Sequence, residues 1–297
     1  MTTFGDLIDD VENVVYNLGT QRDKVTALTS NVDVGDLTIT VADARQCDRG
    51  FIEIDSELIA VNSIDPTSGT VTVQPWGRGA RGTTAAVHNS GVKVTNSPRY
   101  PRVRMATEVK QVIAGLYPDL WWIASDETNT VRPPVVAYPV PANVDSVISV
   151  SVQLIGPSGV WQPVTRWRLD KNADSTAFPT GKSIDLYAGM PPGRKIKIVY
   201  RRDFGTPTDE TTDITTFGLQ ERWRDIIKFR TAARLIITSD AARLQLDNIE
   251  SANRAESIQS LSPARVAQQM NAFAQTRMQE EKLRLLREWP SSQVRSR

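Results

Sequence analysis

Apolar residues open the chain at the three- and four-residue spacing of an amphipathic helix. Thr3 precedes this stretch, Asp6 follows three residues later in a capping-box-like pattern, and Gly19 ends it. The sequence predicts a helix over residues 3–18, within an N-terminal segment of residues 1–19. Its apolar stripe consists of Phe4, Leu7, Ile8, Val11, Val14, Val15 and Leu18.

Residues 20–98 change to a two-residue alternation of apolar and polar positions. The pieces are "LTITV", "FIEI", "ELIAVN", "TVTV" and "VKV", and turn sequences such as "DPTSG" separate them. This alternation is typical of strands that bury one face, so the sequence predicts a small antiparallel β-barrel-like module. The segment "EIDSE", residues 53–57, is expected to form a hairpin whose acidic side faces solvent.

A second helix is predicted after "SPRYP", because Pro101 favours the first helical turn. Its apolar positions continue to Leu116 and Pro118 ends it. The connecting helix is assigned to a segment of residues 99–128. Residues 129–205 return to strand patterns, namely "SVISVSVQLI", "WQPVTRWRLD", "SIDLYAG" and "KIKIVYRRDF". Turns at "GPSGV" and "GMPPGR" separate them, which predicts an antiparallel β-sandwich.

After a polar linker, residues 206–297 have helical patterns almost to the end. Helices are expected at about residues 219–238, 241–260 and 262–289. The last is rich in glutamine and arginine, with a thin apolar stripe of Val266, Met270, Phe273, Leu283 and Leu286. A helix that is polar on most faces usually contacts a partner or lies in solvent. The expected fold class is α+β, with two antiparallel β modules and a helical part that ends in a long C-terminal helix.

Composition narrows the class of protein without selecting a partner. The chain of 297 residues is 40% hydrophobic and 23% charged, which is typical of a globular protein. Its net charge of +1 does not indicate a nucleic-acid or membrane partner. Acids predominate in residues 1–60 and arginines in residues 218–297, an asymmetry that suits head-to-tail contact between copies. Cys47 is the only cysteine, which excludes an intrachain disulfide and fits a reducing place of assembly. No stretch has the pattern of a signal peptide or a membrane span.

Residues 74–94, "QPWGRGARGTTAAVHNSGVKV", are the first candidate for chemistry, since they hold four glycines, two arginines and the only histidine. A phosphate-binding loop would follow a strand and open a helix, whereas Gly82 leads into a short strand. We interpret the glycines as positions of positive φ or close backbone approach in a turn. His88 is interpreted as a hydrogen-bonded structural group, because the sequence places no nucleophile and acid beside it.

Other motifs do not indicate an active site. "FPTGKS", residues 178–183, ends like a nucleotide-binding loop, but Thr176 stands where that loop needs a glycine, so a β-turn is favoured. The patterns HExxH, CxxC and GxSxG are missing. The sequence therefore predicts no catalytic residue, no metal site and no cofactor, although a glycosidase that uses two carboxylates remains an alternative.

Two groups of side chains are candidates for binding. Tryptophans that could stack on sugars or bases are Trp121, Trp122, Trp161, Trp167 and Trp223; core packing is favoured for Trp161 and Trp167. Arginines that recur along one predicted helix, as candidates for a DNA-channel or subunit contact, are Arg222, Arg224, Arg230 and Arg234. The near-zero net charge favours a solvated face or a subunit contact over DNA.

The region from Asp33 to Asn96 resembles a β-module of tailed-bacteriophage virion proteins, in which an "RG..GT.A..H..G..V" pattern follows a hairpin. The matching residues are Arg78, Gly79, Gly82, Thr83, Ala85, His88, Gly91 and Val94. The later stretch from "WQPVTRWRLD" to "KIKIVYRR" also looks like a sandwich of phage neck and connector proteins. With helices at its ends, the whole chain is similar to head-to-tail adaptors.

This resemblance implies a structural virion protein of the neck, assembled in the host cytoplasm. It implies a homo-oligomeric ring, commonly of twelve subunits, beneath the portal protein and above tail proteins, through which double-stranded DNA passes without sequence-specific binding. It transfers no catalytic residue. In line with it, the tail "WPSSQVRSR" is expected to bind a groove of the portal, with Trp289 buried and Arg295 and Arg297 paired with acids. A tail or baseplate subunit, and a carbohydrate-binding or glycoside-cleaving virion protein, remain alternatives.

Overall fold

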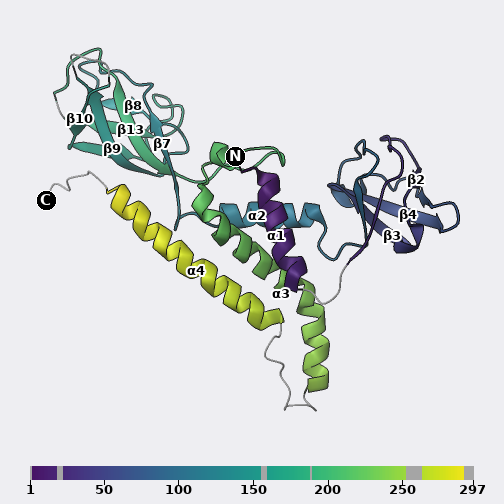
Figure 1. The fold of residues 1–297 in the computed structure, drawn as a ribbon. Coiled ribbons are helices and arrows are strands. Elements are labelled where there is room, and N and C mark those ends of the chain that lie inside the picture. Colours follow the sequence, from purple (N-terminus) through teal and green to yellow (C-terminus); the bar gives the residue numbers. More distant parts are fainter. Residues whose placement is uncertain (1, 19–22, 155–158, 188, 252–262, 291–297) are drawn as a thin grey trace. The chain divides into compact units, whose positions relative to one another are not determined.

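The chain is mixed α/β, with antiparallel sheets and a C-terminal helix (Figure 1). The computed structural model describes residues 2–18, 23–154, 159–187, 189–251 and 263–290. The chain divides into two compact units, each made of segments that are distant in the sequence. One unit contains residues 4–112 and 227–274, and the other contains residues 1–3, 113–226 and 275–297.

The first unit begins with helix α1, Phe4–Leu18, which confirms the predicted N-terminal helix to within one residue. Its buried side chains follow the helical period: Phe4, Leu7, Ile8, Val11 and Val15 are all at most 4% exposed. Arg102, the first residue of helix α2 (Arg102–Ala114), forms an ion pair of 2.6 Å with Asp9 on α1. This contact joins the two helices at their polar edge.

A six-stranded antiparallel sheet follows α1, in the order β1-β6-β3-β4-β5-β2. The strands are β1 (Lys24–Ala27), β2 (Thr38–Thr40), β3 (Gly50–Ile54), β4 (Glu57–Asp65), β5 (Thr70–Val73) and β6 (Lys93–Asn96), with short 3-10 turns at Ala44–Gln46 and Ala80–Gly82. Backbone hydrogen bonds from Thr29 to Thr40 and from Ala42 to Ala27 link the regions of the two outer strands, so the sheet curls. Alternate aliphatic residues, Ile52, Ile54, Ile59, Val61, Val71, Val73 and Val94 among them, fill its interior.

Helices α3 (Arg224–Ser251) and α4 (Pro263–Glu288) form the helical C-terminal part. Short 3-10 turns at Ile214–Phe217 and Glu221–Trp223 precede α3. The predicted break between residues 238 and 241 is wrong, because α3 is continuous there. No glycine or proline lies between residues 224 and 251, so nothing in the backbone chemistry stops the helix. Helix α4 begins at Pro263 and ends one residue before Trp289, close to the prediction.

The second unit contains two antiparallel sheets. One has the order β10-β9-β13-β7 and the other β11-β12-β8. The strands are β7 (Trp122–Asp126), β8 (Ala137–Pro139), β9 (Ser146–Gln153), β10 (Trp161–Val164), β11 (Trp167–Asp170), β12 (Ser183–Leu186) and β13 (Ile196–Arg202). Residues of both sheets share one buried cluster, which includes Val150 and Ile198 from the first and Trp167 and Ile184 from the second.

Two sequence predictions for this unit need correction. The connecting segment of residues 99–128 is helical only in part, because α2 ends at Ala114 and residues 122–126 form β7, which pairs with the distant strand β13. The stretch of residues 161–170 is not one strand: β10 pairs with β9, while β11 pairs with β12 in the other sheet. Thr165 and Arg166 form the corner between the two sheets.

Candidate functional site

The glycine-rich segment of residues 74–94 is a shaped loop, and the predicted glycine roles are confirmed. Gly79, Gly82 and Gly91 have φ values of 61°, 83° and 88°, a region that other residues adopt only at a cost. Gly77 is required for a different reason, since a Cβ there would lie 2.5 Å from the Ala60 carbonyl oxygen. The loop leads into β6 and not into a helix, so it does not offer a helix N-terminus to a phosphate.

Glu57 is the centre of a buried polar network beneath this loop. Its carboxylate accepts hydrogen bonds from Arg78 Nε at 2.8 Å and Nη2 at 3.0 Å, and from the backbone N–H groups of Gly79 and Ala86. Arg78 also donates to the carbonyl oxygens of Asp33, Asp36 and Ala86. The side chains of Glu57 and Arg78 are only 1% and 7% exposed, so this is an internal ion pair that joins distant loops.

The interpretation of residues 53–57 as an acidic solvent-facing hairpin side is therefore wrong for two of its three acids. Glu53 is 9% exposed and Glu57 is buried, whereas Asp55 does face solvent. The hairpin turn lies at Asp55 and Ser56, between β3 and β4. Glu53 thus belongs to one strand and Glu57 to the next, and each points toward polar partners inside the unit.

His88 lies within the same network as a hydrogen-bonded structural group, as predicted. Its Nδ1 is 2.8 Å from Asp55 Oδ2 and its Nε2 is 2.8 Å from Glu57 Oε2. Ionised carboxylates only accept hydrogen bonds, so both contacts are hydrogen bonds at once only when both ring nitrogens carry hydrogen. The His88 backbone also pairs with Val32. The ring therefore connects three segments of the module.

The surroundings of Glu57 set its ionisation. Burial raises its pKa, but hydrogen bonds from Arg78, the Ala86 N–H, His88 and the Gly79 N–H together outweigh burial and lower the pKa to about 2. Glu57 is thus a permanent anion at ordinary pH. With both oxygens occupied, it is suited to holding the loop and not to transferring protons.

Trp289, the residue predicted to bind a portal groove, lies at the end of α4 and is 37% exposed. Trp289 already has neighbours in its own chain, in addition to any partner. Trp289 lines a hollow of about 500 Å³ together with Trp121, Trp122 and Gly218. This hollow exists because residues 122–126 form β7, which the sequence did not reveal. Arg295 and Arg297 lie outside the described residues.

The predicted apolar stripe of α4 is only partly buried: Val266 and Met270 are half-buried, and Met270 packs against Ala233, Ile236 and Ala267, whereas the rest of the stripe is exposed. Of its members, Phe273, Leu283 and Leu286 are 48%, 55% and 42% exposed. The buried face instead carries Ala267, Ala274, Met278, Glu281 and Leu285. Buried Glu281 accepts hydrogen bonds from Trp223 Nε1 at 3.2 Å and from Arg284 Nε at 2.8 Å. Helix α4 is thus a packed helix, contrary to the expectation from its polarity.

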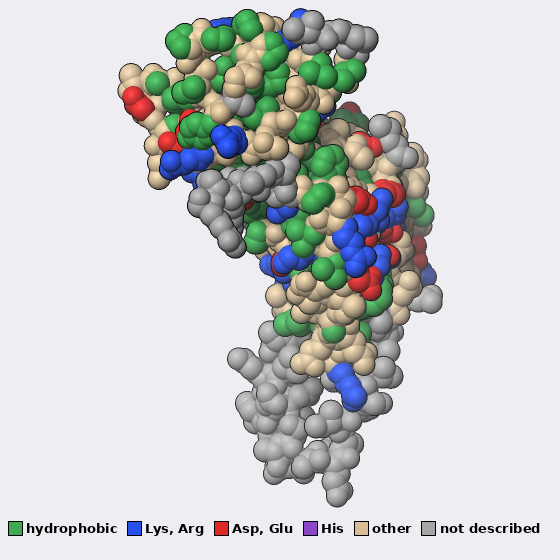
Figure 2. Space-filling view, turned by 90° about the vertical axis from the view of Figure 1, so that its left-hand side faces the viewer, with side chains coloured by type: hydrophobic (Ala, Val, Ile, Leu, Met, Phe, Trp, Pro, Cys, Tyr) green, Lys and Arg blue, Asp and Glu red, His purple; other side chains and the backbone are tan. Residues whose placement is uncertain are grey.

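The four arginines predicted to contact DNA or a neighbouring subunit have different environments. Arg222 lies exposed in the turn before α3, and Arg224 begins α3 with Glu221 at 3.4 Å. Arg230 and Arg234 lie one helical turn apart within α3, and Arg234 Nε is 2.9 Å from Glu108. On the face that Figure 2 shows, basic and acidic side chains of the described residues lie intermingled. These pairs favour contacts within the protein over a phosphate track.

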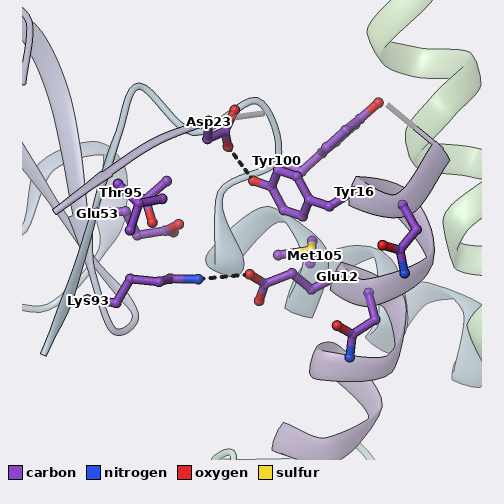
Figure 3. A pocket seen from close by; sticks show the side chains of 11 residues that line it. Glu12, Tyr16, Asp23, Glu53, Lys93, Thr95, Tyr100 and Met105 are labelled. Carbon is purple, nitrogen blue, oxygen red and sulfur yellow. Dashed lines mark hydrogen bonds and ion pairs between the residues drawn. The ribbon is translucent and has the colours of Figure 1, made fainter. Parts of the chain in front are cut away.

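A pocket of the first unit lies between α1 and the curled sheet, with a volume of about 340 Å³ (Figure 3). Its lining combines three carboxyl groups with one lysine: Glu12, Asp23, Glu53 and Lys93. Tyr16, Tyr100, Met105 and Val25 supply apolar surface, and the two tyrosine rings meet edge to face at 6.2 Å. No sequence pattern indicates this pocket, because its residues come from five separate parts of the chain.

Two interactions already occupy polar groups at the rim of this pocket. Lys93 Nζ is 3.1 Å from Glu12 Oε1, and the Tyr16 hydroxyl donates to Asp23 Oδ2 at 2.6 Å. Burial and the neighbouring Asp23 raise the pKa of Tyr16 far above its usual value, so Tyr16 stays a hydrogen-bond donor. Glu53 is different: it accepts one hydrogen bond, from the Arg102 backbone N–H at 2.6 Å.

Comparisons with known proteins do not assign this chain to a family. No protein-family model matches it, and no curated protein matches its sequence.

Within the described residues, His, Cys, Asp and Glu side chains form no group of three that would hold a metal ion. None of the described helices combines the length and apolar character needed to cross a membrane. "FPTGKS" is a turn, as predicted, in which the Gly181 N–H donates to the Phe178 carbonyl oxygen at 2.8 Å.

Proposed function

We propose that the protein is a structural, non-enzymatic virion component of a tailed phage. It acts as a head-to-tail adaptor that forms a ring between portal and tail around the DNA channel. The proposal rests on the resemblance of residues 33–96 to a phage β-module, and on a chain that combines two β modules with a helical C-terminal part. Copies assemble with each other and dock on partners, and no bond is made or broken.

In this proposal the two β modules are compact attachment platforms. The curled sheet of residues 20–98 is a small barrel, supported by the bridge between Leu28 and Val41 near its outer strands. The sheets of residues 129–205 form a sandwich, supported by their shared buried cluster. Both modules expose loops on stable frameworks, which suits contacts with tail proteins or neighbouring subunits.

The docking surface in this proposal is the exposed apolar row Leu283, Leu286 and Trp289 at the end of α4, hereafter the α4 row. Leu283 and Leu286 are turned away from buried Leu285, whereas Trp289 follows Leu285 by four residues, lies on the same side of the helix and borders the hollow with Trp121 and Trp122. Burying a leucine side chain stabilises a complex by about 1.5–3 kcal/mol, and a tryptophan is a typical hot spot. The arginine-bearing segment of residues 291–297 follows directly, and its cations suit an acidic rim on the portal.

The test is co-sedimentation of the full chain and two variants with the cognate portal. We expect a chain that stops after Glu288, and a Leu283→Ala/Leu286→Ala variant, to fold but to lose most portal binding. A matched control is Val136→Ala, which removes a similarly exposed apolar side chain in the second unit. Portal binding that survives in both α4 variants would contradict the assignment of this docking surface.

The carbohydrate-binding alternative receives less support from burial. Trp121, Trp167 and Trp223 are at most 5% exposed, so they cannot stack on a sugar without rearrangement. Trp161 and Trp122 are half-buried, and each carries a cation over its ring, Lys197 and Arg202 respectively. A tail or baseplate subunit would share the same modules and differ in its partner, so the portal test also separates these roles.

A further inference from the structure

The pocket between α1 and the curled sheet has the chemistry of a cation site. Three carboxyl groups, Glu12, Asp23 and Glu53, line it against one lysine. Lys93 pairs with Glu12 at the rim and is 60% exposed, so it does not fill the interior. The space between the aromatic and acidic walls is about 340 Å³, which lies in the lower range of pockets for small ligands.

Glu53 provides the second and independent observation. Its side chain comes from β3 in the sheet, is only 9% exposed and points toward the side chains of α1 (Figure 3). One carboxylate oxygen accepts the Arg102 N–H, and the other has no hydrogen-bond partner in the described part of the chain. Neither Glu53 oxygen is both fully buried and unpartnered, so this second oxygen is accessible from the pocket, where a cationic donor would form a charge-assisted hydrogen bond with it.

We propose that this pocket binds a primary ammonium group on a short alkyl chain. Glu53 accepts a charge-assisted hydrogen bond from the ammonium, and Tyr16, Tyr100 and Met105 contact the alkyl carbons. An ammonium fits better than a guanidinium, because a guanidinium prefers both oxygens of one carboxylate and Glu53 has only one to offer. The two sources of this chemistry are a free polyamine and a lysine side chain of a partner.

Ionisation of Glu53 makes the binding pH-dependent. Burial raises the pKa of Glu53 to about 7, and the negative charge of Glu12 on α1 adds to this increase. The backbone N–H and the charge of Arg102 on α2, together with the charge of Lys93 on β6, lower the pKa. Asp23 and Tyr16 also border the pocket, joined by their own hydrogen bond. Below pH 7 Glu53 becomes neutral and loses its attraction for a cation. Binding is therefore stronger at pH 8 than at pH 6.

The experiment is calorimetric titration of the full chain at pH 8 with spermidine and with Nα-acetyl-lysine amide, using n-butanol as the neutral control. We expect saturable binding of an ammonium and none of butanol. Glu53→Gln keeps an oxygen for the Arg102 N–H, and we expect it to weaken binding at least tenfold. Glu280→Gln, an exposed acid on α4 remote in sequence from the pocket, should leave binding unchanged.

A second variant keeps the test decisive if Glu53→Gln does not fold. Lys93→Gln removes one of the two cations that pair with Glu12, the other being Arg102 at 3.6 Å, so we expect it to tighten ammonium binding, whereas a purely structural ion pair predicts no such change. If spermidine binds more tightly than the lysine amide, the site is assigned to a free polyamine. If the lysine amide binds more tightly than spermidine, the site is assigned to a partner's lysine. The absence of saturable binding, or binding that Glu53→Gln leaves intact, would overturn the proposal.

Discussion

Glu57 shows at the scale of one residue how the curled sheet holds its long loop. A buried carboxylate that pairs with a buried guanidinium gives little net stability by itself, but removal of one partner leaves the other charge unpaired. We expect Glu57→Gln to lower the free energy of unfolding by about 3–5 kcal/mol, because Arg78 then loses its counter-ion. Urea unfolding measures this change. Asp55→Asn is the matched control, because Asp55 is 58% exposed, and a similar loss in both variants would contradict the account.

Unlike Glu57, Glu53 destabilises the folded protein when its carboxyl group is ionised. Its folded pKa of about 7 lies above the reference value of 4.5, so the folded state holds its proton more tightly than the unfolded chain. Stability from this group is therefore complete below about pH 4.5 and decreases as pH rises through 7. We expect Glu53→Gln to become more stable than the natural chain as pH rises from 5 to 8, by up to about 3 kcal/mol. Thermal unfolding at several pH values, without amines, tests this; a difference that is independent of pH would refute it.

The sequence revealed some of these residues and concealed others. Its glycine spacing was sufficient to predict the turn, and the isolated His88 was correctly interpreted as structural. The burial of Glu53 and Glu57 was not predictable, because alternation assumes one continuous strand. The hairpin turn at Asp55 and Ser56, with Asp55 at a φ of 52°, restarts the alternation and turns both flanking acids inward.

At the scale of elements, Gly79 and Gly82 in the loop of residues 74–94 differ in the space that they leave for a Cβ. Gly82 has a φ of 83° and open space where a Cβ would lie, whereas a Cβ at Gly79 would lie 2.9 Å from the Thr83 carbonyl oxygen. We expect Gly82→Ala to lower the free energy of unfolding by about 1–2 kcal/mol from backbone strain alone. Gly79→Ala should cost more, since strain and a steric clash add. Equal costs in chemical unfolding would show that the loop shifts to relieve the clash.

Helix α4 shows why large apolar residues are a poor guide to the buried face of a polar helix. Ala267 and Ala274 permit close packing, and Glu281 is buried through its hydrogen bonds, so the larger residues at 283 and 286 remain outside. We expect Leu285→Ala to cost about 2–5 kcal/mol of stability. Leu283→Ala, the matched exposed leucine, should change stability by less than about 0.5 kcal/mol. Thermal or urea unfolding of both variants checks this, and equal effects would contradict the assignment of faces.

At the scale of the molecule, the sequence predicted the α+β class, the antiparallel pairing and most strands. It did not predict that each compact unit gathers distant segments, since residues 113–226 join with 275–297 in one unit. Strand β7 was missed for the same reason, because its identity depends on pairing with β13, which lies far along the chain. Pairing between distant segments leaves no local periodic signal.

Charge asymmetry gives a prediction for assembly. Acids predominate in residues 1–60 and arginines in residues 218–297, so contacts between copies are expected to be partly electrostatic. We expect ring formation to weaken between about 0.1 M and 0.5 M salt, because exposed pairs are screened beyond about 10 Å at 0.1 M. Sedimentation velocity across this range measures it. Assembly that is insensitive to salt would indicate apolar interfaces instead.

The central claim is that copies of this chain form a ring on a phage portal. Mass measurement in solution of the purified chain, alone and mixed with the cognate portal, tests it most directly. We expect the mixture to form a discrete complex that contains one portal and a fixed set of copies, commonly twelve, and the α4-row variants to leave the portal bare. A portal that keeps its own mass in the presence of excess folded chain would contradict the account.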